Sequence, residues 1–365
     1  MGERGGNPTH PERRSKPLEG NDSSQEKCET FTISEPSLKL LFDSLDLTWV
    51  EARVTSKYSQ RRRRPPLPGI PLVRAHLFKD IRQIKSYRKL QRALEEHDGQ
   101  WAQALGFKRP PHHDSFSAFR HRLGSELFIE IFRELRARLL QLKPDLAEII
   151  AIDSTAIQAY ARSGRGHRKS SDPDAKWGIR IDPKTSKKEH FFGYKLHTAL
   201  SARYGAPLDF RVTPGKCSDS PEFPKLLHGL SEASVTFNIA VADAGYDARN
   251  NYFVALKHKA KPIIAYNRRR KPKGTTGRRL DRILPIQRNS TEWKRYYALR
   301  GAIERQFSEL KEQLGMKFLT LRGLESVTIH LCISLIVLLA INLVAHLTGN
   351  PEFLRSVEPW RYSDV

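Results

Sequence analysis

Two apolar stretches of the sequence each carry an aspartate, and this feature constrains the fold more than any other. EIIAIDST, residues 148–155, contains Asp153, and FNIAVADAG, residues 237–245, contains Asp243. Both patterns predict buried strands. Because burying a bare carboxylate is costly, each side chain must be paired, hydrogen-bonded or bound to a metal. One such aspartate is commonly a turn former or a helix N-cap, but two in one sheet favour convergence on a common point.

The segments around these stretches predict an α/β fold. Three more runs have strand character, namely HFFGYKLHTALSA (190–202), PLDFRVTPG (207–215) and AKPIIAYN (260–267), and RYGA reads as a hairpin turn between the first two. Helical patterns cover residues 219–233 and 248–259, and another helix follows a basic insertion. This order predicts a mixed five-stranded sheet flanked by helices.

The rest of the chain predicts a modular arrangement. In residues 70–145 apolar residues recur at three- and four-residue steps among many basic ones, which predicts a helical N-terminal domain. Such a domain suits DNA binding, although a helical bundle without that role would show the same pattern. The expected segments are a disordered polar tail at 1–33, a short helix and basic proline-rich linker at 34–69, the helical domain at 70–145, the α/β domain at 146–348 with a basic insertion at 267–292, and a C-terminal tail at 349–365.

The charge balance indicates which class of molecule the protein binds. The chain has 63 Lys and Arg residues against 40 Asp and Glu residues, a formal net charge of +23. Such an excess is typical of proteins that bind a polyanion, and nucleic acid is the commonest one. An anionic membrane is the alternative, but it usually requires an amphipathic helix or a lipid signal. The three widely spaced residues Cys28, Cys217 and Cys332 argue against a disulfide framework or a zinc site.

One segment raises the question of a membrane span. LCISLIVLLAINLVA, residues 331–345, is apolar and has no formally charged residue. A spanning helix needs ~20 such residues, and a shorter run is more commonly a buried core helix. We therefore expect a central core helix, and the polar N-terminus, which lacks an apolar segment, does not predict a secretory signal.

A third acid lies in YALRGAIERQFSELK, residues 297–311. If this stretch forms one helix with ~100° per residue, Tyr297, Arg300, Glu304 and Lys311 lie on one stripe. The simplest interpretation is a solvated face with an Arg–Glu pair, which stabilises a helix by only ~0.2–0.5 kcal/mol. If the helix packs across the two strands, however, Glu304 joins the two aspartates.

Three carboxylates without histidine or cysteine partners favour Mg²⁺ or Mn²⁺ over zinc. Two such ions, ~3.5–4 Å apart, can bind the attacking and the leaving oxygen of an in-line phosphoryl transfer. Together with the basic charge, the acids predict a protein that cuts or joins a nucleic-acid backbone.

The spacing of Tyr297, Arg300, Glu304 and Lys311 resembles the Y-x2-R-x3-E-x6-K signature of a large group of bacterial insertion-sequence transposases of the DDE class. AIDST and VADAGYDARNNY look like the two aspartate blocks of that family. FGYKLH and PLDFRVTPGKCSDSPEF resemble its second and third strands. The resemblance covers roughly residues 110–345.

The resemblance implies a ribonuclease-H-like fold for the α/β domain. It also implies that Asp153, Asp243 and Glu304 are the catalytic metal ligands and that they hold two Mg²⁺ or Mn²⁺ ions. Tyr297, Arg300 and Lys311 would bind the DNA end. The implied reaction is water attack on a transposon-end phosphodiester, followed by attack of the freed 3′-hydroxyl on target DNA.

The implied partners are double-stranded terminal repeats and target DNA. Pairing two ends suggests at least a homodimer, and the implied location is the bacterial cytoplasm, in association with the nucleoid.

The basic insertion RRRKPKGTTGRRLDR, residues 268–282, departs from the family pattern. It has eight basic residues, one acid and no aromatic residue, whereas well-known members carry a longer insertion with an aromatic residue that grips a flipped base. We expect a mobile DNA clamp here, in which Arg268, Arg269, Arg270 and Lys271 bind DNA. Two other functions remain open, namely a non-catalytic DNA-binding protein derived from a transposase and a metal-dependent nuclease without strand transfer.

Overall fold

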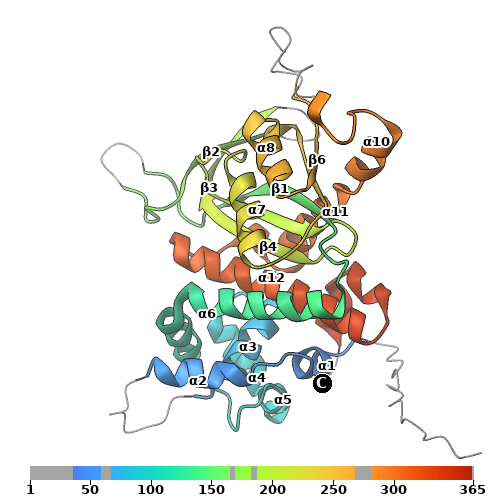
Figure 1. Ribbon diagram of the computed structural model, residues 1–365. Coiled ribbons are helices and arrows are strands. Elements are labelled where there is room, and N and C mark those ends of the chain that lie inside the picture. Colours follow the sequence, from blue (N-terminus) through green and yellow to red (C-terminus); the bar gives the residue numbers. More distant parts are fainter. Residues whose placement is uncertain (1–35, 59–66, 165–168, 182–186, 268–281, 364–365) are drawn as a thin grey trace, which may run out of the picture. The chain divides into compact units, whose positions relative to one another are not determined.

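The computed structural model describes residues 36–58, 67–164, 169–181, 187–267 and 282–363 (Figure 1). All of them belong to one unit of the chain, Thr32–Val365. The N-terminal part of this unit is helical, as the sequence predicts. Its elements are α1 (Leu38–Asp43), α2 (Thr48–Ser56), α3 (Gly69–Ile81), α4 (Tyr87–Glu95), η1 (His97–Gly99), α5 (Gln100–Leu105) and α6 (His113–Leu142).

Local hydrogen bonds explain where two of these helices begin. The Glu51 carboxylate of α2 accepts hydrogen bonds from the backbone N–H groups of Gly69 and Ile70, each at 2.9 Å, and so satisfies the free donors at the start of α3. The Ser86 hydroxyl accepts from the Lys89 N–H at 3.2 Å and caps α4. The Glu51 contact also joins α2 to α3.

The sheet has six strands: β1 (Ile149–Gln158), β2 (Lys176–Ile181), β3 (Lys188–Ser201), β4 (Pro207–Pro214), β5 (Ile239–Ala242) and β6 (Lys261–Ile264). β3 pairs antiparallel with β1, β2 and β4, whereas β5 is parallel to β1 and β6 is parallel to β5. The order is β2-β3-β1-β5-β6, with β4 also on β3. The arrangement is ribonuclease-H-like, which confirms the predicted mixed sheet and fold class.

The predicted count of five strands was wrong, because β2 was missed. Gly178 interrupts this strand, and a glycine weakens a strand pattern. Its lack of a side chain is required, since a Cβ atom there would lie 2.6 Å from the Phe191 ring. The apolar residues of β2 also point outward, with Trp177 and Ile179 exposed by 55% and 52%.

Helices cover the sheet on both sides (Figure 1). α7 (Glu222–Glu232) packs against β4, α8 (Arg249–Lys257) packs against β6, and α11 (Gly301–Ser308) packs against β1. The remaining elements are η2 (Ala244–Tyr246), α10 (Thr291–Ala298), a π-helical turn η3 (Glu309–Gln313), η4 (Met316–Phe318), α12 (Leu324–Leu347), η5 (Pro351–Arg355) and α13 (Glu358–Tyr362). The predicted C-terminal tail is folded onto this unit, since Trp360 is fully buried.

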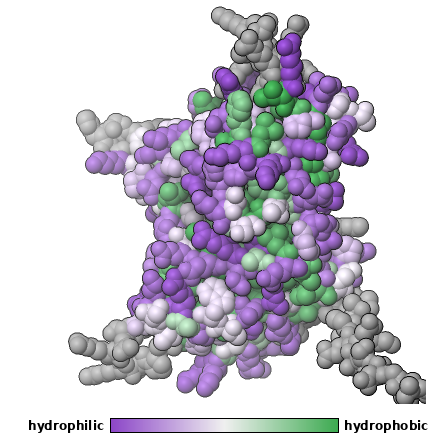
Figure 2. All heavy atoms as spheres, in the orientation of Figure 1, coloured by the Kyte–Doolittle hydropathy of each residue, from purple (hydrophilic) through white to green (hydrophobic). Residues whose placement is uncertain are grey.

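The apolar segment at 331–345 lies inside α12. Among the described residues α12 is the one helix long and apolar enough to cross a membrane, and 89% of its most apolar window is buried in the protein. It packs against α3, α6 and β4, and its Ser334 hydroxyl donates to Asp80 at 3.0 Å. The predicted core helix is therefore confirmed. On the protein face shown in Figure 2, hydrophilic residues predominate around smaller hydrophobic patches.

We expect Leu335→Ala in α12 to lower the free energy of unfolding by ~2–5 kcal/mol, because the side chain is fully buried and its removal leaves a cavity. Leu347→Ala, at the exposed end of the same helix, is the matched control, because its side chain is 43% exposed. Urea unfolding followed by circular dichroism measures both. Equal losses for the two variants would contradict a buried core position for Leu335.

Candidate active site

The two aspartates identified in the sequence lie next to each other in the sheet. β1 and β5 are parallel neighbours, and their last paired residues are Ile152 and Ala242. Asp153 is the next residue of β1, and Asp243 is the residue that directly follows β5. Adjacent strands lie ~4.8 Å apart, so the sheet brings these two carboxylates to the same edge.

Local backbone groups orient both carboxylates. The Asp153 carboxylate accepts from the Ser154 N–H at 2.7 Å. Asp243 follows the end of β5, and its carboxylate accepts from the Gly245 N–H at 2.8 Å, which caps η2. The alternative reading of Asp243 as a cap is thus correct as well, and it leaves the second oxygen of that carboxylate for another ligand.

Arg300 connects the first and the third acid. One guanidinium nitrogen donates to Asp153 at 3.2 Å, and the other donates to Glu304 one turn along the chain. The structure therefore brings Asp153, Asp243, Glu304 and Arg300 into one cluster, with Asp153 largely buried and Glu304 exposed. The Arg300–Glu304 pair is not merely a solvated surface pair, because the same guanidinium reaches the sheet.

The electrostatics of the cluster reflect burial and like charge. Burial and the nearby Asp243 carboxylate raise the pKa of Asp153 to about 7. Burial also raises the pKa of Asp243. Burial alone would lower the pKa of Arg300, but Asp153, Tyr297 and Glu304 raise it above its usual value. Two acids that repel each other, with one fixed cation beside them, form a site that favours additional positive charge.

The single helix expected over residues 297–311 was wrong. α10 ends at Ala298, α11 begins at Gly301, and the π-helical turn follows from Glu309. Between α10 and α11 the backbone hydrogen bonds span three residues instead of four, for example from the Arg300 N–H to the Tyr297 carbonyl at 3.0 Å. The tighter turn changes the angles on which the predicted stripe depended, although Arg300 still points to the acids.

Tyr297 lies beside the cluster in a fixed stack. Its ring stacks on Trp293, with the ring centroids 4.7 Å apart and the planes at 14°, and the Arg300 guanidinium lies 5.9 Å from its centroid. Trp293 is buried, as expected for a residue under the helix. One face of Tyr297 is therefore covered by the Trp293 ring.

Lys311 lies on the π-helical turn, apart from the acids. In the described ranges it forms no ion pair with Asp153, Asp243 or Glu304, and burial and the neighbouring Arg180 of β2 lower its pKa. The structure thus groups Lys311 with a basic strand at the sheet edge and not with the three carboxylates.

The π-helical turn is held from two distant parts of the chain. The Gln83 side chain, after α3, donates to the carbonyl groups of Glu312 and Gln313 at 2.6 and 2.9 Å. Arg361 of α13 donates to the Gln313 carbonyl at 2.8 Å. These contacts satisfy carbonyl groups that the end of a helix leaves free.

The four basic residues predicted to clamp DNA, Arg268, Arg269, Arg270 and Lys271, lie outside the described residues. Their role stays a prediction.

A fourth acid near the cluster was missed in the sequence. Asp219 lies between β4 and α7, and its Oδ1 atom accepts from the Lys195 ammonium at 2.9 Å. Its charge contributes to the raised pKa values of both Asp153 and Asp243. Asp219 opens the run DSPEF, where an aspartate is a common helix-start residue, so the pattern gave no reason to group it with the strand acids.

The oxygen atoms of Asp153, Asp243 and Glu304 are not among the described ligand groups that lie within 4.8 Å of one another. In the part of the chain that the structure describes, one group of three ligand atoms lies within 4.8 Å of one another, and it is His112, His113 and Asp114 at the start of α6. Its two histidines lie beside the Asp114 carboxylate, and His113 is also hydrogen-bonded to Gln91. In the acid cluster Arg300 lies between two of the carboxylates. The donor chemistry, which is oxygen only, fits Mg²⁺ or Mn²⁺ held by Asp153, Asp243 and Glu304.

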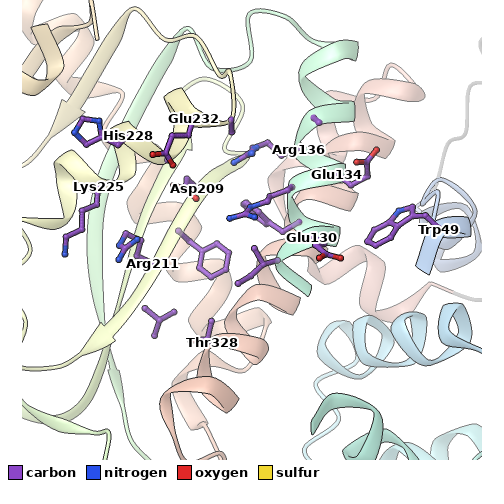
Figure 3. A pocket seen from close by; sticks show the side chains of 18 residues that line it. Trp49, Glu130, Glu134, Arg136, Asp209, Arg211, Lys225, His228, Glu232 and Thr328 are labelled. Carbon is purple, nitrogen blue, oxygen red and sulfur yellow. The ribbon is translucent and has the colours of Figure 1, made fainter. Parts of the chain in front are cut away.

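A cavity of about 1340 Å³ lies elsewhere, between α6, β4 and α7 (Figure 3). Its lining mixes bases such as Arg136, Arg211 and Lys225 with acids such as Asp209 and Glu232. Burial raises the pKa of Asp209 to about 6, although Arg136 opposes this. The cavity contains none of the clustered acids, and its mixed charge does not indicate a nucleic-acid groove.

The fold and the acid cluster define a ribonuclease-H-like protein with a candidate site for divalent cations. A family model described as a transposase DDE domain matches residues 144–342, and a second model described as a transposase domain matches residues 26–122. The first match covers more than half of the chain, so the protein belongs to the DDE transposase family. The finer assignment to the group with the Y-x2-R-x3-E-x6-K signature stays a prediction.

Two solved structures of transposases are among those that match the chain. A cryo-EM structure of the piggyBac transposase synaptic complex with hairpin DNA has a TM-score of 0.44 and 11% identity, covering 88% of this chain and 78% of that chain. The Mos1 transposase paired-end complex with the left transposon end has a TM-score of 0.20 and 13% identity, covering 70% and 83%. A search of curated proteins gave no match.

Proposed function

We propose that this transposase cleaves phosphodiesters at transposon ends and joins the freed 3′-hydroxyl groups to target DNA in a metal-dependent reaction. The observation that carries the proposal is the cluster of Asp153 and Asp243 on adjacent strands, with Arg300 reaching from Asp153 to Glu304. Membership of the DDE family supports the same class of chemistry.

The three acids would bind two Mg²⁺ or Mn²⁺ ions. Such ions, when bound, activate a water molecule and stabilise the charge that develops on the leaving oxygen. The acids contribute by their position: Asp153 and Asp243 are fixed by the sheet and by backbone N–H groups, whereas Glu304 lies on a helix that packs across β1. The rigid strands supply the orientation that such catalysis requires.

The basic and aromatic residues around the acids would hold the DNA. Arg300 has five N–H donors and can bond to phosphate oxygens as well as carboxylates. Tyr297 offers a hydroxyl beside it, and Lys311 would bind a phosphate farther along the strand. In the first step water adds to phosphorus and the bond to the 3′-oxygen breaks. In the second step the resulting 3′-hydroxyl adds to a target phosphorus and displaces the target's own 3′-oxygen.

The proposed partners are the double-stranded terminal repeats and the target DNA. Two ends must meet for coordinated joining, so we propose a homodimer or larger assembly on DNA, acting in the bacterial cytoplasm at the nucleoid.

A cleavage and joining assay tests the proposal. We expect the wild-type protein with Mg²⁺ to nick a labelled duplex that carries the element ends and to join the 3′-hydroxyl ends to a target plasmid. Glu304→Gln should lose both products, because the amide is a much weaker cation ligand. Glu312→Gln, an exposed substitution on the neighbouring π-helical turn, is the matched control and should retain both.

Two other results of this assay would indicate a different function. Nicks that never join would indicate a nuclease without strand transfer. Specific DNA binding without cleavage in Mg²⁺ or Mn²⁺ would indicate a DNA-binding protein derived from a transposase.

A further inference from the structure

We infer that Asp219 is a fourth carboxylate of the cation site and that Lys195 is the positioning residue that orients it. This inference rests on the proposed metal-dependent function and adds a residue to its site. It follows from the contacts of Asp219, from a buried polar group aimed at it, and from its position relative to the other acids.

The contacts of Asp219 use one side of its carboxylate. Lys195 donates to Oδ1 at 2.9 Å, and the His197 ring nitrogen Nδ1 lies 3.8 Å from the same oxygen. Among the described residues no hydrogen bond or ion pair involves Oδ2. The side chain is one-third exposed, at 33%, so the free oxygen is open to a ligand from solvent.

His197 provides an independent indication that the arrangement is built around Asp219. The imidazole is fully buried, and its Nε2 atom is hydrogen-bonded to the Thr213 hydroxyl at 2.8 Å. Its Nδ1 atom has no hydrogen-bond partner within the described chain and is aimed at Asp219. A buried ring nitrogen left in this state is costly unless a nearby polar group or ligand satisfies it.

The position of Asp219 places it on the side of the two strand aspartates. Ser220, the next residue, accepts a hydrogen bond from the Asn251 amide at 3.0 Å, and the same amide donates to the Tyr246 carbonyl at 2.8 Å, in the turn that follows Asp243. The charge of Asp219 also helps to raise the pKa of Asp153 and of Asp243. Lys195 is 9% exposed and lies on β3. Its ammonium group fixes one oxygen of the Asp219 carboxylate, which is how a hydrogen-bonding partner orients a metal ligand.

Two cations suit this wider spread of acids better than one. The carboxylates do not close around a single point, and two ions ~3.5–4 Å apart require ligands over a broader area. Four carboxylates also offset the charge of two divalent ions more fully than three do.

Binding of Mn²⁺ to the DNA-free protein tests the inference, measured by the electron paramagnetic resonance signal of free Mn²⁺. We expect two ions per chain in the wild type. Asp219→Asn should lower the affinity for the second ion by more than ~10-fold. Changes to residues that merely orient a ligand already cost ~10–100-fold in metal affinity. Asp145→Asn is the matched control, because Asp145 also pairs with a lysine, Lys143 at 3.1 Å, and it should bind like the wild type.

A double variant separates direct binding from simple charge compensation. Asp219→Asn alone leaves the buried Lys195 ammonium unpaired, which could repel a cation or impair folding. Lys195→Met/Asp219→Asn removes both charges and avoids that problem. If Asp219 binds the ion, the double variant also lacks tight binding of the second ion. Wild-type binding by the double variant, or by Asp219→Asn itself, would overturn the inference.

A third arm distinguishes this inference from the proposed function. Asp153→Asn should weaken Mn²⁺ binding strongly if the metal-dependent function is correct. Unchanged binding in Asp153→Asn would reject the metal site as a whole. Weakened binding in that variant together with unaffected Asp219 variants would reject only the role of Asp219.

Discussion

Asp153→Asn is expected to reduce cleavage of transposon ends by more than ~100-fold while DNA binding survives. Loss of a residue that only orients a metal ligand typically costs ~10–100-fold, so loss of a ligand itself should cost more. The substitution is compatible with the fold, because burial and Asp243 raise the pKa of Asp153 to about 7, so the site already tolerates a neutral group there. The Asn side-chain oxygen can still accept the hydrogen bond from Arg300.

The measurement is a time course of nicking on a labelled terminal-repeat duplex, with binding followed by fluorescence anisotropy on the same DNA. Asp145→Asn, on the turn before β1, is the control for a neutral substitution near this strand. Cleavage at the wild-type rate by Asp153→Asn would exclude Asp153 as a catalytic ligand. A loss of both binding and cleavage would indicate a folding defect and would require thermal unfolding of the variant.

DNA affinity is expected to fall steeply with salt. A formal charge of +23 predicts extensive contact with phosphates. With ~6–10 such contacts, affinity should fall by ~10³–10⁵-fold between ~50 and ~200 mM salt, because binding releases the cations condensed on DNA. Anisotropy titrations of the terminal-repeat duplex at several KCl concentrations give the slope of log affinity against log salt.

A single phosphate contact can be tested within the same experiment. Lys311→Gln should reduce the magnitude of the slope by about 1 if Lys311 binds one phosphate. Lys39→Gln in α1 should leave the slope unchanged, because Lys39 already pairs with Asp43 at 2.7 Å on the helical surface. A nearly flat salt response of the wild type would contradict a basic DNA-binding surface.

The sequence was most informative where burial and charge conflict. An aspartate close to the end of an apolar run is a local pattern, and Asp153 does lie on the buried strand β1, while Asp243 directly follows β5. Their adjacency depends on strand order, which the sequence left open. The 331–345 segment was also expected in the core, because fifteen apolar residues are too few for a span. The helix that contains it has 24 residues and is long enough to cross a membrane, so its burial, and not its length, shows that it is a core helix.

Other features depended on contacts that a linear pattern does not contain. The break between α10 and α11 lies at Leu299 and Arg300, which have good helix propensity, and only Gly301 after them disfavours a continuous helix. β2 was hidden by Gly178, whose small size is required by Phe191 on the next strand. Asp219 joins the acids only because β3 and β4 pair, which brings Lys195 and the turn after β4 together.

The packing of α12 has a consequence for how the protein unfolds. This helix contacts α3 and α6 of the helical layer and also β4 of the sheet, so both layers pack against the same helix. Neither layer can separate without exposing that helix to water. The helical part and the sheet therefore share a cooperative unit, and the geometry of the acids is tied thermodynamically to the packing of the N-terminal helices.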